Sequence, residues 1–302
     1  MIPSKWIYVV PYFLSAVLFL SGFFVIFSPL PLLILAFHSS QKNRGRTYLA
    51  MVTNAALVAV AGGKSSLYFY AIFILSTALS LPEFLKRKFS LEKSGALTLF
   101  AVLLVGAGFL FINFRIHHLH FTDGFQMLLN SLVDYMNQSL SPEVKNSLFE
   151  KIDPEEWKQG LWMELPSGVA IFSLILVWVN LITLLRLNPG RIREFLCLDL
   201  GYFRKWKAPE FLLWPTILCG FFIVMSIGVI PSAVALNVFK FLMAIYALQG
   251  LSILTYFFDL WGIRGLFRSI AYVLSVFIML PLVLSIGFFD LWFDFRGKLR
   301  QS

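Results

Sequence analysis

Charged residues are scarce in this sequence, and the common signatures of nucleotide-driven and hydrolytic enzymes are missing. Asp, Glu, Lys and Arg make up 14% of the 302 residues, whereas soluble domains carry about 25%. The sequence contains no GxxxxGK[ST], GxSxG, HExxH or paired CxxC pattern. We therefore expect no P-loop for ATP, no enzymatic activity and no cofactor. Only two cysteines are present, Cys197 and Cys219, and a helical connection would hold them beyond disulfide reach.

Apolar side chains dominate instead. Hydrophobic residues make up 59% and aromatic residues 17% of the chain, and the mean hydropathy is +0.79. A helix needs about 20 apolar residues to cross a bilayer, so this composition predicts an all-α polytopic bundle that forms a single membrane domain over residues 1–302. The first apolar run, Trp6 to Phe37, is too long for a signal-peptide core, and we expect it to remain as an anchor. Eight spans are predicted, at residues 6–28, 47–61, 67–81, 96–115, 165–185, 211–230, 235–257 and 269–289.

The net charge of +9 follows a topological pattern. Lys and Arg gather in four loops, at HSSQKNRGR, EFLKRKFSLEK, residues 186–210 and DLWGIRGLFR. Short loops rich in Lys and Arg stay in the cytoplasm, so we expect these four loops inside and both termini outside. This arrangement accounts for the charge without nucleic acid. The tail DFRGKLRQS, whose cations favour the inside, conflicts with it, and the N-terminus moves inside if residues 6–28 and 29–37 both cross.

Residues 116–164 form the longest segment without a span. Apolar residues at helical spacing predict an amphipathic helix in its first half. Ser141 with Pro142, and Asp153 with Pro154, are typical of helix starts. We expect this segment to lie outside the membrane as a helical, lid-like insertion.

One predicted span carries a continuous polar face. In residues 235–257, Asn237, Lys240, Ser252 and Thr255 fall on one side of the helix, and Asp259 continues this face just beyond the span. A lysine at the centre of a membrane helix costs about 2.5–3.5 kcal/mol, and ionisable groups there are candidates for function. We interpret the four as candidate ligand-binding residues. In the alternative interpretation, Lys240 reaches the outer interface and the polar neighbours bond other helices.

Small residues and a second polar stripe predict close helix contacts. Ala55, Ala59 and Gly63 are spaced four apart, which lets another helix approach. This ladder either packs within the chain or receives a partner subunit. Asn180, in the 165–185 span, is expected to bond a neighbouring helix.

The end of the last predicted span is acidic. The sequence FFDLWFDFR contains Asp290, Asp294 and Arg296, and on one helix the two acids share a face. Either acid can pair with the arginine. We interpret this stretch as an interfacial anchor and as a candidate partner-contact site.

A histidine pair follows the 96–115 span. His117 and His120 lie on one helical face, with Asp123 just beyond. Two imidazoles and a carboxylate can bind a metal. No second histidine cluster lies on that side, so we expect solvated side chains and no metal.

The motifs SPLPLLIL, AALVAVAGG, APEFLLWP, NVFKFLMAIYALQGLSILTYFF and GFFDLWFDFR resemble the YybS-like family of bacterial multi-pass membrane proteins. Residues 205–296 match it best. The resemblance implies a location in the bacterial cytoplasmic (inner) membrane and a fold similar to the S components of energy-coupling-factor transporters. In such folds a non-helical connection after the first helix covers a ligand cavity, which makes Pro29 and Pro31 candidate cavity residues. The alternative is a simple kink followed by a half-helix that ends at Phe37.

The function expected from these features is a membrane subunit that binds or transports a small solute. Its cavity would combine Pro29, Pro31, the polar face of 235–257 and the 116–164 lid. An ATPase module would be supplied by another protein, with Ala55, Ala59 and Gly63 as a candidate dock. The alternative is a non-transporting assembly protein of the bacterial cell envelope.

Overall fold

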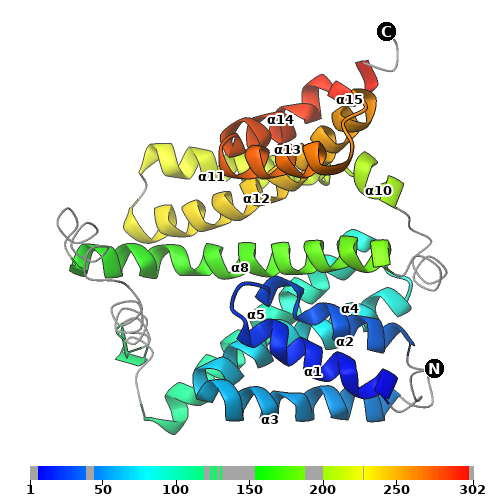
Figure 1. The fold of residues 1–302 in the computed structure, drawn as a ribbon. Helices are drawn as coiled ribbons and strands as arrows, with labels where there is room; N and C mark the ends of the chain where they lie inside the picture. The colour runs from blue at the N-terminus through cyan, green and yellow to red at the C-terminus, as the bar shows by residue number, and fades with distance from the viewer. Residues whose placement is uncertain are drawn as a thin grey trace, which may run out of the picture. The chain divides into compact units, whose positions relative to one another are not determined.

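The computed structural model describes most of the chain, and its residues form two compact units, Met1–Cys197 and Leu198–Ser302 (Figure 1). All regular secondary structure in the described part is helical, which confirms the predicted all-α class. The described residues are 6–38, 44–118, 123–124, 126–127, 130, 154–187, 200–226 and 228–298.

Membrane-length helices are present in both units. Among the residues that the structure describes, four helices are long and apolar enough to cross a bilayer: Ser66–Lys86, Leu91–Ile116, Met163–Leu187 and Ile230–Leu260. A bent pair, Gly265–Phe277 with Leu280–Phe293, makes a fifth if it is one span. Where the spans 6–28 and 211–230 are predicted, the structure has the shorter apolar helices Val10–Leu20, Val25–His38 and Glu210–Met225.

The first unit is a bundle of apolar helices. Its core is built from residues of α1, α2, α3, η3 and α4, together with Val102 of α5 and Leu176 of α8, and α5 packs against α4 and α8. The elements are α1 (Trp6–Leu20), η1 (Val25–Phe27), α2 (Pro29–His38), α3 (Arg44–Phe69), the π-helical η3 (Tyr70–Leu75), α4 (Ser76–Lys86), α5 (Leu91–Ile116) and α8 (Pro154–Leu187).

The two prolines near the N-terminus begin a helix and do not break one. After α1 the chain turns at Gly22, with φ 69°, and passes through η1. Pro29 and Pro31 then occupy the first turn of α2, where a missing N–H costs no intrahelical hydrogen bond. Both prolines are buried. The half-helix alternative is therefore confirmed, and the irregular backbone lies before the prolines.

The two short spans predicted at 47–61 and 67–81 are two helical segments that meet at a kink within α3. α3 is interrupted at Gly63, with φ 79° and ψ −177°, a conformation that glycine adopts without strain. The chain then continues through η3 into α4, so the helical segment at the predicted span 67–81 runs from Ser66 to Lys86.

The predicted external helix at Pro154 and the predicted span 165–185 are one helix. α8 begins at Pro154, as the sequence predicts, and continues through Pro166 to Leu187 over 34 residues. The proposed starts at Ser141 and Pro142, and most of the 116–164 insertion, lie outside the described residues.

The second unit is organised around one long helix, α12. Its 32 residues contact α10, α11 and α14. The elements are α10 (Leu200–Lys205), η4 (Glu210–Leu212), α11 (Leu213–Met225), α12 (Val229–Leu260), α13 (Gly265–Phe277), α14 (Leu280–Phe293) and α15 (Phe295–Lys298).

The predicted span 269–289 is not one straight helix. α13 and α14 are bent by 89° at Ile278 and Met279 (Figure 1). Pro281, in the first turn of α14, has no N–H with which to continue the hydrogen-bond ladder of α13. The two parts therefore run in different directions.

Glycines let α12 and α14 cross closely. A Cβ on Gly250 would overlap the carbonyl oxygen of Val283, and one on Gly287 would overlap the carbonyl oxygen of Tyr246. Only glycine permits this backbone approach. The crossing places the end of α14 beside the second half of α12.

Candidate functional site

A buried ion pair closes the end of α14. Arg296 Nη2 lies 2.9 Å from Asp290 Oδ2, and the two side chains are 9% and 0% exposed. Gln249 Nε2 donates to the same carboxylate oxygen at 3.0 Å, and the Phe295 amide donates to Oδ1 at 2.9 Å. These three donors satisfy both oxygens of the buried carboxylate.

The arginine of this pair also binds the segment that follows α10. Its Nη1 donates to the carbonyls of Arg204 at 3.2 Å and Trp206 at 3.1 Å, and to Ser252 Oγ at 3.2 Å. Ser252 Oγ in turn donates to the Phe203 carbonyl at 2.6 Å. The network therefore joins α12, α14 and the connection between α10 and η4.

One contact of this network bears on the expected position of the C-terminus. Arg296 lies against the Arg204 and Trp206 carbonyls, so the end of α14 meets residues 204–206, which the sequence assigns to a basic loop, within the second unit. The sequence predicts opposite sides for them. The difference follows from the 89° bend, because α13 and α14 do not form the single straight span that this prediction assumes.

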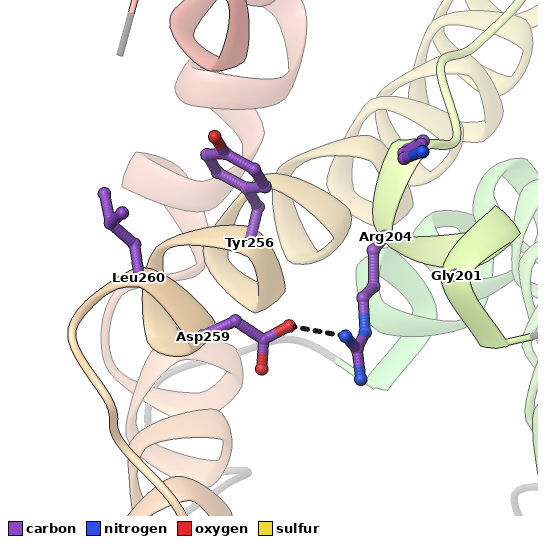
Figure 2. Close-up of a pocket in the computed structure, with 6 residues that line it drawn as sticks. Gly201, Arg204, Tyr256, Asp259 and Leu260 are labelled. Carbon is purple, nitrogen blue, oxygen red and sulfur yellow. Dashed lines mark ion pairs between the residues drawn. The ribbon is translucent and has the colours of Figure 1, made fainter. Parts of the chain in front are cut away.

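A pocket opens beside this network, between α10 and the C-terminal end of α12. Its volume is about 390 Å³. Figure 2 shows Arg204 and Asp259 facing one another across it, with Tyr256 and Leu260 on the α12 side. The pocket is lined by Gly201, Arg204, Lys205, Tyr256, Asp259 and Leu260.

One carboxylate in the pocket serves two arginines. Asp259 Oδ2 lies 3.1 Å from Arg204 Nη1, and Oδ1 lies 2.5 Å from Arg268 Nη1. Arg268 also donates to the hydroxyl of Tyr272 and to the carbonyl of Thr255. Thr255 Oγ1 lies 2.8 Å from the Tyr272 hydroxyl, which fixes the phenol against the guanidinium.

The predicted ligand-binding residues do not form one site. Pro29 and Pro31 are buried in the first unit. Asn237 donates its side-chain amide to the Ala233 carbonyl at 2.8 Å, and Lys240 is partly buried in the first half of α12. Asn237 and Lys240 lie about 28 Å or more from Asp259 along the helix, at 1.5 Å per residue. The polar residues of α12 therefore lie in two separate parts of the helix, Asn237 and Lys240 in the first half and Asp259 near the C-terminal end.

Ser252 and Thr255 lie near the pocket but do not line it. Ser252 is buried in the ion-pair network, and Thr255 supports the Tyr272 phenol beside Asp259. Both hydroxyls bond to protein groups. We interpret them as positioning residues for the arginines.

The predicted partner-contact residues differ in accessibility. Ala55 is buried in the core of the first unit, Ala59 is partly buried and Gly63 is exposed. The small residue Ala55 thus serves packing within the chain. In the second unit, Asp290 and Arg296 are also buried, so neither offers an open surface for a partner.

Asp294 is accessible and does not share a helical face with Asp290. α14 ends at Phe293, and Asp294 is its left-handed cap, with φ 39°. Its Oδ1 accepts a hydrogen bond from Lys207 Nζ at 2.8 Å. This bond holds the pKa of Asp294 below its usual value.

The first unit contains a buried polar network without charge. Tyr70 Oη lies 2.8 Å from Ser15 Oγ and accepts from Asn54 Nδ2 at 2.8 Å, and Ser28 Oγ donates to the Ser15 carbonyl at 2.9 Å. Asn180 Nδ2 donates to the Ile26 carbonyl at 2.6 Å, which confirms its predicted bond to a neighbouring element. Of these bonds, the one from Asn180 satisfies a carbonyl of the irregular connection between α1 and α2.

Sequence reasoning did not select the charged residues of the pocket as site residues. Arg204, Lys205, Asp259 and Arg268 count there only as loop charges or as the end of a polar face. One signal was present: Asp259 is the acid that precedes two arginines in DLWGIRGLFR. As for metals, no group of three His, Cys, Asp or Glu ligands occurs in the part of the chain that the structure describes.

Comparison with known proteins places the chain in a family. No curated protein and no solved structure matches it. A family described as predicted membrane protein (DUF2232) matches residues 6–291, nearly the whole chain. Together with several membrane-length helices, this match means that the chain is a multi-pass membrane protein of the DUF2232 family.

Proposed function

We propose that this protein is a membrane-embedded subunit that binds or transports a small solute and has no ATPase of its own. The observation that carries the proposal is the charged pocket between α10 and the end of α12. Ligand sites are concave and place a few polar groups within apolar surroundings. Tyr256 and Leu260 provide the apolar wall here, and Arg204, Lys205 and Asp259 provide the polar groups.

The proposal also includes a likeness to energy-coupling-factor S components and the YybS-like family, with eight spans as the full count. It places the protein in the bacterial inner membrane, with the basic loops in the cytoplasm. The pocket, which includes Arg204, Lys205 and Asp259, would then open on the cytoplasmic side. A partner ATPase would dock on the accessible part of the small-residue ladder, at Ala59 and Gly63.

The test is a purification of the tagged full-length chain in mild detergent, followed by mass spectrometry of bound proteins and extracted small molecules. Leu260 lines the pocket and is exposed, so Leu260→Trp fills the pocket at little cost to the fold. Leu266→Trp is the matched control, because Leu266 is exposed on α13 and does not line the pocket. We expect a stoichiometric bound molecule in the wild type and in Leu266→Trp, and its loss in Leu260→Trp.

Asn237 and Lys240 are tested in the same assay. If the pocket is the solute site, Asn237→Ala and Lys240→Ala keep the bound molecule. Loss in these two variants and retention in Leu260→Trp would move the site to the first half of α12. The absence of any bound molecule, together with unchanged solute uptake in a deletion strain, would contradict the proposal.

The second candidate function is a non-transporting assembly protein of the cell envelope. It is favoured by the exposed ion pair between Lys207 and Asp294, which leaves a charged surface at the end of α14. Co-purifying envelope proteins without an ATPase and without a small molecule would support this alternative.

A further inference from the structure

The charges around the pocket are unequal. Among the described residues that line the pocket or pair with its lining, Arg204, Lys205 and Arg268 contribute three positive charges and Asp259 contributes one negative charge. A concave site with an excess of one sign attracts ligands of the opposite sign. This excess of positive charge favours an anionic ligand in the pocket.

Arg268 already neutralises Asp259. Its side chain is 21% exposed, and its guanidinium also donates to the Tyr272 hydroxyl and the Thr255 carbonyl. Four kinds of support fix its position: burial, the carboxylate, the phenol and the carbonyl. We therefore expect the ion pair between Asp259 and Arg268 to remain intact when a ligand binds in the pocket.

Arg204 is held far less firmly. Its side chain is 49% exposed and shares Asp259 with Arg268. Exposed ion pairs contribute little to stability, so the guanidinium can exchange Asp259 for a ligand anion at little cost. Lys205 is exposed beside it and lines the same pocket.

We propose that the pocket binds a phosphate-bearing ligand, with Arg204 and Lys205 as its anion ligands. This inference rests on the proposed function and names the ligand class of the same site. A guanidinium matches two phosphate oxygens at once, and a lysine adds a compact charge. Tyr256 and Leu260 contact the less polar part of the ligand.

Two sources can supply this phosphate. One is a soluble phosphorylated solute, and the other is the headgroup of an anionic lipid. The aromatic pair next to the pocket agrees with either source, because Trp261 is 65% exposed, stacks on Phe257 at 5.4 Å between ring centroids, and such rings favour the membrane interface. The experiment has one arm for each source.

Binding is measured with the full-length chain in nanodiscs of phosphatidylcholine. One arm titrates inorganic phosphate and pyrophosphate by calorimetry. The other adds spin-labelled phosphatidylglycerol and measures its immobilisation. We expect binding in at least one arm, weakened tenfold or more in the double variant Arg204→Gln/Lys205→Gln.

Two further variants test whether the loss of phosphate binding is specific to the pocket. Arg87→Gln/Lys88→Gln removes the same charge from exposed residues of the first unit and is expected to leave binding unchanged. Asp259→Asn removes the carboxylate that competes for Arg204 and is expected to tighten phosphate binding at least threefold. A gain of affinity cannot arise from a misfolded protein.

The outcomes separate the two proposals. Equal binding in the wild type and in Arg204→Gln/Lys205→Gln, or no binding in either arm, overturns the phosphate assignment. If a neutral or cationic molecule then co-purifies and is lost in Leu260→Trp, the solute-binding function stands and only its ligand class is wrong. If no molecule co-purifies either, both proposals fail.

Discussion

The two units bury polar groups in different ways. In the first, Ser15, Asn54 and Tyr70 form a neutral network that joins α1, α3 and η3. In the second, Asp290 and Arg296 form a charged pair that holds the segment after α10. Leaving a buried neutral group without its hydrogen-bond partner costs less stability than leaving a buried charge without its partner. Removing one partner of the buried polar network is therefore expected to cost less stability in the first unit than in the second.

The largest effect is expected from Arg296→Met. This change leaves the Asp290 carboxylate buried without its cation, and it frees the Trp206 carbonyl. Breaking a buried pair in this way costs about 3–5 kcal/mol of unfolding free energy. Reversible unfolding in mixed detergent, followed by circular dichroism, measures the loss.

The control is the double variant Asp290→Leu/Arg296→Met, in which no buried charge remains. It is expected to recover most of the lost stability, because replacing a whole buried pair by apolar groups is often nearly neutral. If single and double variants are equally unstable, the charge is not the cause.

The next effect concerns the close crossing of α12 and α14. Gly287→Ala forces a methyl group into the carbonyl oxygen of Tyr246, so the helices must separate. Overpacking of this kind costs about 1–3 kcal/mol. Gly108→Ala is the matched control, because a Cβ on Gly108 in α5 meets no atom within 4 Å. A loss of thermal stability as large in Gly108→Ala as in Gly287→Ala would contradict this explanation.

A smaller effect is expected in the neutral network. Tyr70→Phe removes the hydroxyl that meets Ser15 and Asn54 but keeps the ring. Interhelical hydrogen bonds in membrane proteins contribute about 0.6 kcal/mol on average and up to about 1.7. Tyr68→Phe is the control, since the Tyr68 ring contacts Phe109 and its stacking is retained. A cost above that of Arg296→Met in the same unfolding assay would reverse the comparison of the two units.

The smallest effect is expected at the exposed pair of Lys207 and Asp294. Exposed pairs of this kind contribute about 0.2–1 kcal/mol, so Lys207→Gln should change the unfolding free energy by no more than this amount. The lowered pKa of Asp294 gives the effect a pH dependence. The contribution is complete above the ordinary aspartate pKa, about 3.9, and is lost as the pH falls through the lower pKa of the folded state. Wild type and variant should therefore converge in acid, and a difference that grows on acidification would contradict this cause.

Several elements could be predicted because their signals are local. Apolar runs predict the long helices α5, α8 and α12, and Pro154 marks the start of α8. Pro281 was a local signal for a helix start. Because it lies within one continuous apolar run, the sequence was interpreted as a single span and the 89° bend was not predicted. The pairing of Arg296 was predicted only as a choice between two acids.

The polar site was harder to predict, since its contacts join distant parts of the chain. Gln249 and Asp290 lie 41 residues apart, and Arg296 and Trp206 lie 90 apart. Helical spacing relates residues a few positions apart and carries no information on such pairs. Arg204 was therefore counted only as a loop charge, and Asp259 only as the end of the polar face of 235–257.

By itself, the sequence determined that the chain is a helical membrane protein, because spans are set by the length and hydropathy of continuous segments. Only the tertiary structure decided which polar residues meet. It separated Lys240 from the pocket, buried Asp290 and Arg296, and placed Arg204 opposite Asp259. The reason is physical: insertion depends on the sum of local transfer energies, whereas a site depends on the bend and the crossing that bring distant segments together.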